Sequence, residues 1–316
     1  GSMASFIAAG TAYATQGVPM IPFLTYYSMF GFQRVGDLIW QATDARARGF
    51  LLGATAGRTT LLGEGLQHQD GHSLLLASVN PVIEAYDPAF AYEVATIVED
   101  GLRRMCADEE DVIYYLTLYN ENQVMPPRPD GAAEGVIEGL YRWADAPEGP
   151  STPATLVFSG TANLAAREAQ SQLAEHYDVA AELHSATSYK RLREQALSTE
   201  RLNRLHPEHT PRVPRVTELL EGEGPIVAVT DFMKAIPDQI ARWVPEGRSF
   251  TPLGTDGFGR SDTREALRRH FEVDAAHVVV ATLAALAASG DGKPEAVTDA
   301  IARYELDPEQ IDPRLA

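Results

Sequence analysis

The chain has 316 residues, 45% hydrophobic and 22% charged, which is typical of a globular protein and long enough for two domains. Its 26 Lys and Arg against 44 Asp and Glu give a net charge of −18. This balance argues against nucleic acid and against an anionic membrane as partners, because both bind basic surfaces. The single cysteine, Cys106, excludes a disulfide framework and indicates a cytoplasmic location. The longest apolar run, Val278–Ala288, is shorter than the roughly 18–20 residues that span a bilayer and predicts a buried helix.

The first half of the chain alternates between helical and strand patterns. Helices are expected at Ala4–Ala14, Leu38–Arg48 and from Asp87-Pro88 to Met105. Buried strands are expected at Met20–Tyr27 and Phe50–Thr55, and further strands at Val82–Tyr86 and Asp111–Tyr119. Asp87 is expected to cap the third helix, with Pro88 at its first position. This alternation predicts a parallel α/β sheet, in which sites lie beyond the carboxyl ends of the strands.

A connector rich in Pro, Gly, Ser and Thr, Trp143–Pro153, is the expected domain boundary. The alternation restarts beyond it, so we expect an α/β domain at 1–146 and another at 147–316. Strands are expected at Ala154–Ser159, Val179–Ser185, Ile226–Thr230 and Phe250–Leu253. Helices are expected at Leu164–His176, Met233–Trp243, Thr263–Arg269, Ala275–Ala288 and Pro294–Tyr304.

The segment Gly57–Ser73 (GRTTLLGEGLQHQDGHS) has no apolar period, so it predicts a loop, and its titratable residues make it a candidate site. Glu64, His68 and His72 follow one another at steps of four, which on a helix would place them on one face. They could form a metal site or an acid/base cluster, or they could be incidental residues of a solvated loop. The glycines among them argue against a helix.

Three other patterns predict ordinary structure. Gly290-Asp291-Gly292 copies the start of a thiamine-diphosphate metal motif, but no asparagine follows it, so it predicts a helix end. The glycine-rich segment Gly254–Gly259 lacks dinucleotide-binding spacing. Cys106 precedes an acidic run and is expected to pack at a helix end.

Four segments together carry a family resemblance: Tyr26–Asp37 (YYSMFGFQRVGD), the histidine loop, Asn120–Pro127 (NENQVMPP) and Leu253–Asp274 (LGTDGFGRSDTREALRRHFEVD). The chain resembles the homodimeric bacterial type of pyruvate dehydrogenase, the thiamine-diphosphate-dependent decarboxylating component of the pyruvate dehydrogenase complex. The resemblance implies two transketolase-like α/β domains, a truncated pyrimidine-binding domain and a C-terminal domain.

The resemblance also implies roles for particular residues. Phe30 is expected to stack on the aminopyrimidine ring of the cofactor, and Tyr27 to face the substrate side of the thiazolium. His68, with Glu64 beside it, is expected in the pyruvate pocket, and His72 behind it. Such residues suit the chemistry, because the protein must orient the keto acid and stabilise developing charge. Arg260, Ser261 and Asp262 are expected to form a structural turn at a dimer interface.

The implied cofactors are thiamine diphosphate and Mg²⁺, and the implied partners are pyruvate, the lipoylated acetyltransferase, a second copy and the missing N-terminal portion. The metal-diphosphate motif and the activating glutamate are absent from the chain, so we expect the chain alone to be inactive. Gly1–Met3 fit the family as native residues, although such a start can also be a cloning remnant. Two alternatives remain: a non-catalytic dimerisation module, and a metal hydrolase that uses Glu64, His68 and His72.

Overall fold

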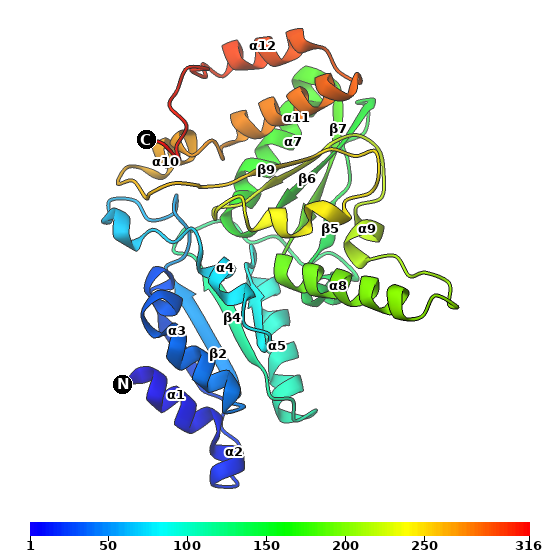
Figure 1. The fold of residues 1–316 in the computed structure, drawn as a ribbon. Coiled ribbons are helices and arrows are strands. Elements are labelled where there is room, and N and C mark those ends of the chain that lie inside the picture. Colours follow the sequence, from blue (N-terminus) through cyan, green and yellow to red (C-terminus); the bar gives the residue numbers. More distant parts are fainter.

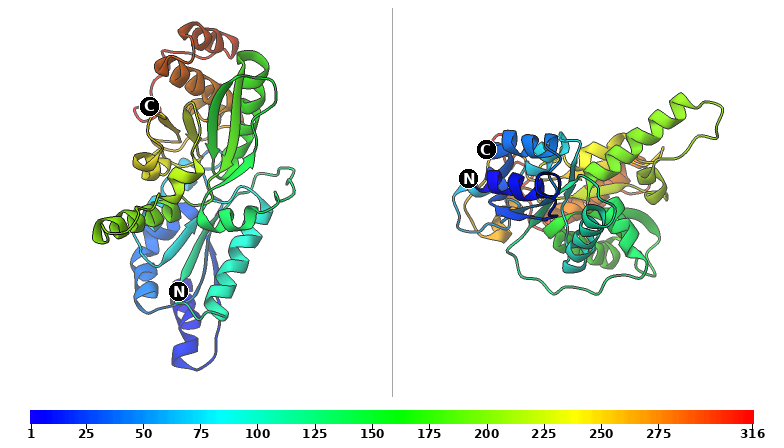
Figure 2. Two further views of the ribbon diagram at one scale, coloured as in Figure 1. Left: turned by 90° about the vertical axis from the view of Figure 1, so that its right-hand side faces the viewer. Right: turned by 90° about the horizontal axis from the view of Figure 1, so that it is seen from below.

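The computed structural model describes residues 1–316 and contains two α/β units, each built on its own sheet (Figure 1). The side view in Figure 2 shows the two units end to end along the long axis of the molecule. The expected α/β fold class is therefore confirmed.

The N-terminal sheet is entirely parallel, with the strand order β1-β2-β4-β3. Its strands are β1 (Phe23–Tyr26), β2 (Gly49–Ala54), β3 (Ile83–Tyr86) and β4 (Ile113–Leu118). The prediction that the first strand is buried is wrong, because β1 lies at the sheet edge and alternates between exposed and half-buried residues. Its apolar residues lie on both faces: Leu24 and Tyr26 are half-buried and pack against the core, whereas Phe23 is exposed and stacks on Phe50 of β2 with ring centroids 4.5 Å apart.

The N-terminal unit contains six α-helices and one short 3₁₀ helix. They are α1 (Ser2–Gly10), α2 (Ala12–Thr15), α3 (Ser28–Asp44), η1 (Leu66–His68), α4 (Ser73–Ser78), α5 (Ala91–Cys106) and α6 (Ala132–Glu138). Helix α3 begins at Ser28, ten residues before the predicted start, and it includes Gly31 and Gly36, but it is kinked at Val35, whose backbone is not helical. The predicted helix Leu38–Arg48 overlaps the part of α3 that follows this kink. Gly31 belongs in the helix because it lies against the ring of Tyr26, which leaves no room for a Cβ.

The predicted cap of the third helix is also wrong. Helix α5 begins at Ala91, and the buried carboxylate of Glu93 accepts the backbone N–H groups of Ala89 and Phe90. Asp87 is buried instead, where Thr117, Tyr119 and Ser159 donate hydrogen bonds to its carboxyl group. The carboxyl group of Asp87, which the local sequence pattern predicted to cap the helix, thus accepts hydrogen bonds from residues that are remote in the sequence.

The C-terminal sheet has the order β5-β7-β6-β8-β9, parallel except for β5. Its strands are β5 (Tyr141–Ala144), β6 (Thr152–Phe158), β7 (Val179–Ser185), β8 (Ile226–Val229) and β9 (Phe250–Leu253). Strand β5 was not expected, and it pairs with β7. The C-terminal sheet therefore begins at Tyr141, ahead of residue 147.

The C-terminal helices surround this sheet. They are η2 (Gly160–Ala162), α7 (Asn163–Tyr177), α8 (Tyr189–Leu205), α9 (Arg215–Leu219), η3 (Pro237–Trp243), α10 (Arg264–His270), α11 (Ala275–Ser289) and α12 (Pro294–Arg303). The stretch Arg264–Ser289 has the length and hydropathy of a membrane span, with 56% of the window buried inside the protein. Within it, α11 packs on α7 and β8, as a core helix does. Gly290 ends α11 in the left-handed conformation, as the sequence predicted for this glycine motif.

The two units share a hydrophobic core. One cluster of 27 buried residues includes Leu51 and Ile113 of the N-terminal sheet and Ile226 and Trp243 of the C-terminal unit. Helix α8 leaves the C-terminal unit and packs beside β3 (Figure 1).

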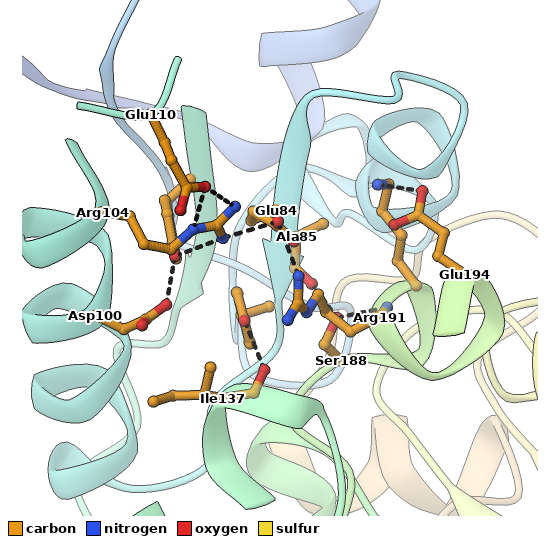
Figure 3. A network of polar contacts seen from close by, with 12 residues as sticks. Glu84, Ala85, Asp100, Arg104, Glu110, Ile137, Ser188, Arg191 and Glu194 are labelled. Atoms are coloured by element: carbon orange, nitrogen blue, oxygen red, sulfur yellow. Dashed lines mark hydrogen bonds and ion pairs between the residues drawn. The ribbon is translucent and has the colours of Figure 1, made fainter. Parts of the chain in front are cut away.

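An ion-pair network links α8 to β3. Figure 3 shows Arg104 of α5 and Arg191 of α8 approaching Glu84 of β3 from two sides. Each guanidinium lies 2.9 Å from Glu84 Oε1. Arg104 also pairs with Glu110, and the Tyr114 hydroxyl group donates to Asp100. The network therefore joins elements of both units.

Candidate functional site

Two segments meet at the carboxyl edge of the N-terminal sheet. Tyr27 directly follows β1, and the histidine loop leaves the neighbouring strand β2 after Ala54. Because β1 and β2 are parallel, both exits lie at the same edge of the sheet. The structure thereby brings residues some 40 positions apart into contact.

Tyr27, Phe30 and His68 form an aromatic cluster at this edge. The ring of His68 stacks on that of Tyr27, with centroids 5.3 Å apart and planes at 12°. Phe30 meets His68 edge-on at 5.5 Å and Tyr27 at 6.0 Å. Tyr27 remains 49% exposed, so the cluster is open to solvent and could receive a further ring.

Glu64 orients the imidazole of His68. Its Oε2 lies 3.1 Å from His68 Nδ1, and both side chains are about one-third exposed. A carboxylate at Nδ1 accepts the proton of that nitrogen, which leaves Nε2 to face a ligand. The four residues singled out in the sequence, Tyr27, Phe30, Glu64 and His68, therefore lie together.

His72 lies outside the aromatic cluster. Its Nε2 is 2.6 Å from Nε2 of Gln33 on α3, and its backbone N–H donates to Asp70. The loop is irregular apart from the single turn η1, as predicted, so the steps of four do not produce a helical face.

The ligand set does not favour the metal-hydrolase alternative. The only three His, Cys, Asp or Glu residues whose ligand atoms approach closely enough for one ion are His206, Glu208 and His209. All three are exposed and follow α8, on a different part of the chain from His68.

Arg34 is a site neighbour that the sequence analysis missed. Its guanidinium lies 4.0 Å from the centroid of the Phe30 ring. Arg34 follows Phe30 by four residues on α3, so the two side chains share one helix face. The signal was present in the sequence, but it could be read only once α3 was known to start at Ser28.

The turn Arg260–Asp262 packs against the histidine loop of the same chain. The backbone N–H of Arg260 donates to Gln69 Oε1 at 2.8 Å, and its carbonyl oxygen accepts from Gln69 Nε2 at 2.5 Å. The turn thus has a structural contact within one chain, and its expected place at a dimer interface stays a prediction.

Two families of domains match the chain. Residues 1–126 match the pyruvate dehydrogenase E1 component middle domain, and residues 139–274 match the transketolase-like C-terminal domain. Among solved structures, transketolase from Leishmania mexicana is 17% identical with a TM-score of 0.63, covering 86% of this chain and 35% of that one. A structure titled "Split gene transketolase, inactive beta4 tetramer" is 18% identical with a TM-score of 0.61, covering 89% and 81%.

Curated relatives are much closer in sequence. The pyruvate dehydrogenase E1 component of Pseudomonas aeruginosa is 50% identical over 314 residues, which cover 99% of this chain and 36% of that protein. The E1 component of Mycobacterium tuberculosis is 53% identical over 310 residues (97% and 33%), and that of Escherichia coli 50% over 317 residues (100% and 35%). The chain thus spans about a third of the length of these relatives.

Fold and site together define a two-unit transketolase-like α/β protein. Pyruvate dehydrogenase E1 components align with nearly the whole of this chain at about 50% identity, which identifies the family within this class of proteins. The chain belongs to the pyruvate dehydrogenase E1 family of enzymes, and it corresponds to their middle and C-terminal domains. The resemblance stated from the sequence is confirmed.

Proposed function

We propose that the aromatic cluster forms the pyrimidine-side wall and part of the pyruvate pocket of a thiamine-diphosphate-dependent pyruvate dehydrogenase. The observation that carries the proposal is the contact of Tyr27, Phe30 and His68 at the carboxyl edge of the sheet. An exposed aromatic face beside an oriented imidazole suits a planar heterocycle and a small carboxylate substrate.

The residues present fit the ring part of thiamine diphosphate. Arg34 covers one side of Phe30, so the other side of the ring is where an aminopyrimidine would stack. Tyr27 would line the substrate side. When bound, the cofactor supplies the acceptor for the electron pair released as the carboxylate leaves pyruvate.

Mg²⁺ requires several oxygen ligands, and the residues around the cluster do not supply them. Glu64 is the one carboxylate seen to contact the cluster, and it is held by His68. We propose that residues outside these 316 hold the metal and diphosphate, and that the chain alone does not decarboxylate pyruvate.

His68 would act on the substrate. With Nδ1 bonded to Glu64, its Nε2 can bind the carboxylate or carbonyl oxygen of pyruvate and hold a proton there. Tyr27, stacked on the imidazole, would hold the ring plane and offer a hydroxyl donor. We further propose that the acetyl group passes to a lipoylated acetyltransferase and that a second copy of the subunit takes part, as expected for an E1 component.

Pyruvate decarboxylation with thiamine diphosphate and Mg²⁺ tests the proposal. The chain alone and the chain joined to the remaining two thirds of a relative's length should be compared. Turnover is expected only from the joined form, and robust turnover by the 316-residue chain would overturn the expected inactivity.

Replacing His68 by alanine in the joined form tests the site itself. The substitution is expected to lower kcat/KM for pyruvate by about 100-fold or more, since it removes a group that exchanges protons with the substrate. His176→Ala, at an exposed position near the end of α7, is the matched control and should retain wild-type turnover. Wild-type rates from His68→Ala would remove His68 from the site.

A further inference from the structure

The histidine loop starts from the N-terminal sheet, yet the C-terminal unit holds it in place through hydrogen bonds. Thr59 N–H donates to Asp231 Oδ1 at 3.0 Å, and Met233 N–H donates to the carbonyl oxygen of Gly71 at 2.8 Å. Arg264 Nε donates to the carbonyl oxygen of Thr60 at 3.0 Å. The loop is therefore tied near both of its ends.

Gln69 forms the tie nearest to His68. Its side chain is 1% exposed, and every group of its amide is used. Nε2 donates to the carbonyl oxygens of Leu61 (3.1 Å) and Arg260 (2.5 Å), and Oε1 accepts the N–H of Arg260 (2.8 Å). One side chain thus binds both backbone groups of Arg260, which fixes the distance and orientation between the two loops.

This tie acts directly on the backbone that carries His68. Gln69 closes the single turn η1, with its own N–H bonded to the carbonyl oxygen of Leu66. The opposing loop is in backbone contact there, because a Cβ on Gly259 would lie 2.5 Å from that carbonyl oxygen. A shift of Gln69 would therefore displace the adjoining imidazole from its stack on Tyr27.

We propose that Gln69 is a positioning residue, which clamps the Arg260 backbone of the C-terminal unit and so holds the His68 imidazole against Tyr27. The C-terminal unit then sets the geometry of the substrate wall without touching the substrate. That the wall faces pyruvate rests on the proposed function, whereas the positioning of His68 does not.

The test compares Gln69→Met with Gln67→Met. Methionine keeps the length and packing of glutamine but removes all three hydrogen bonds. Gln67 is an exposed glutamine of the same loop whose side chain makes no hydrogen bond in the structure, so it is a matched control. Gln69→Glu is a second variant, which keeps the acceptor for the Arg260 N–H but turns a carboxylate oxygen toward two carbonyl oxygens.

The first measurement is the nuclear Overhauser effect between the ring protons of His68 and Tyr27 in the 316-residue chain. The second is kcat/KM for pyruvate in the joined enzyme. Both Gln69 variants are expected to lose the ring contact and to lower kcat/KM at least tenfold, while Gln67→Met retains both.

Several outcomes would overturn the proposal. One is a Gln69 variant that unfolds at a lower temperature but keeps the His68–Tyr27 contact, since Gln69 would then be only structural. Another is equal loss of the contact in Gln67→Met. If the ring contact responds as expected but the wild-type joined enzyme does not decarboxylate pyruvate, the proposed function fails and the positioning role stands.

Discussion

The carboxyl group of Asp231 is buried at the junction between the histidine loop and the C-terminal unit. Burial raises its pKa from 3.8 to about 7, although hydrogen bonds from Thr59 and the charge of Arg268 oppose this increase. The nearby carboxyl group of Asp87 also raises the pKa of Asp231. The guanidinium of Arg58 is close enough to interact with the charge of Asp231.

This displaced pKa predicts how stability depends on pH. Between about pH 4 and pH 7 the unfolded chain loses the Asp231 proton while the folded chain keeps it, so the free energy of unfolding falls as pH rises. In Asp231→Asn the decrease should be smaller by at least about 1 kcal/mol. Urea unfolding at pH 4.5, 6 and 7.5 measures the slope. Identical slopes for both proteins would show that Asp231 does not titrate in this range.

At the scale of elements, the start of α3 decides where Phe30 lies. Gly31, one residue later, packs against the half-buried ring of Tyr26, so Gly31→Ala should destabilise the chain by about 1–3 kcal/mol through overpacking. Gly36→Ala, at the glycine that follows the kink of α3 at Val35, is the control. No atom lies near its missing Cβ, so alanine should stabilise by about 0.5–1 kcal/mol.

Thermal and urea unfolding of the two glycine variants test the position of the helix. Opposite changes in the free energy of unfolding are expected. If Gly31→Ala is as stable as the wild type, Tyr26 is free to move and the start of α3 is not fixed by this contact.

The elements that the sequence predicted well are those with a strong local pattern. Strand β2, helix α11 and the irregular course of the histidine loop were all predicted from their own residues. The contacts within the aromatic cluster followed from the family resemblance rather than from spacing, since Tyr27 and His68 are far apart in the chain. The wrong predictions have causes outside the local sequence. Gly31 lies inside a helix because it packs against the ring of Tyr26. The carboxyl group of Asp87 does not cap a helix because it accepts hydrogen bonds from hydroxyl groups that are remote in the sequence.

For the whole molecule, the Glu84 network is a test of how the units are held together. Glu84→Ala leaves Arg104 with Glu110 but leaves Arg191 without its carboxylate, and we expect a loss of about 2–3 kcal/mol in the free energy of unfolding. Asp145→Ala removes an ion pair whose carboxylate is 84% exposed, and it should change stability by less than about 0.5 kcal/mol.

Chemical denaturation of both ion-pair variants provides the comparison. Equal, small effects would mean that solvent screens the Glu84 pair as it does an exposed one. A large effect of Glu84→Ala alone would show that helix α8 is anchored to β3 through this carboxylate.

The hydrophobic cluster shared by the two units has a consequence for exchanging domains between relatives. A chimera that joins the first unit of this chain to the last unit of a relative takes its shared core from two parents, at about 50% sequence identity. Core side chains of the last unit, at positions such as Trp243, then pack against side chains of the first unit that come from a different protein. Recombination at the apparent domain boundary therefore requires both sides of the cluster to be transferred or redesigned together.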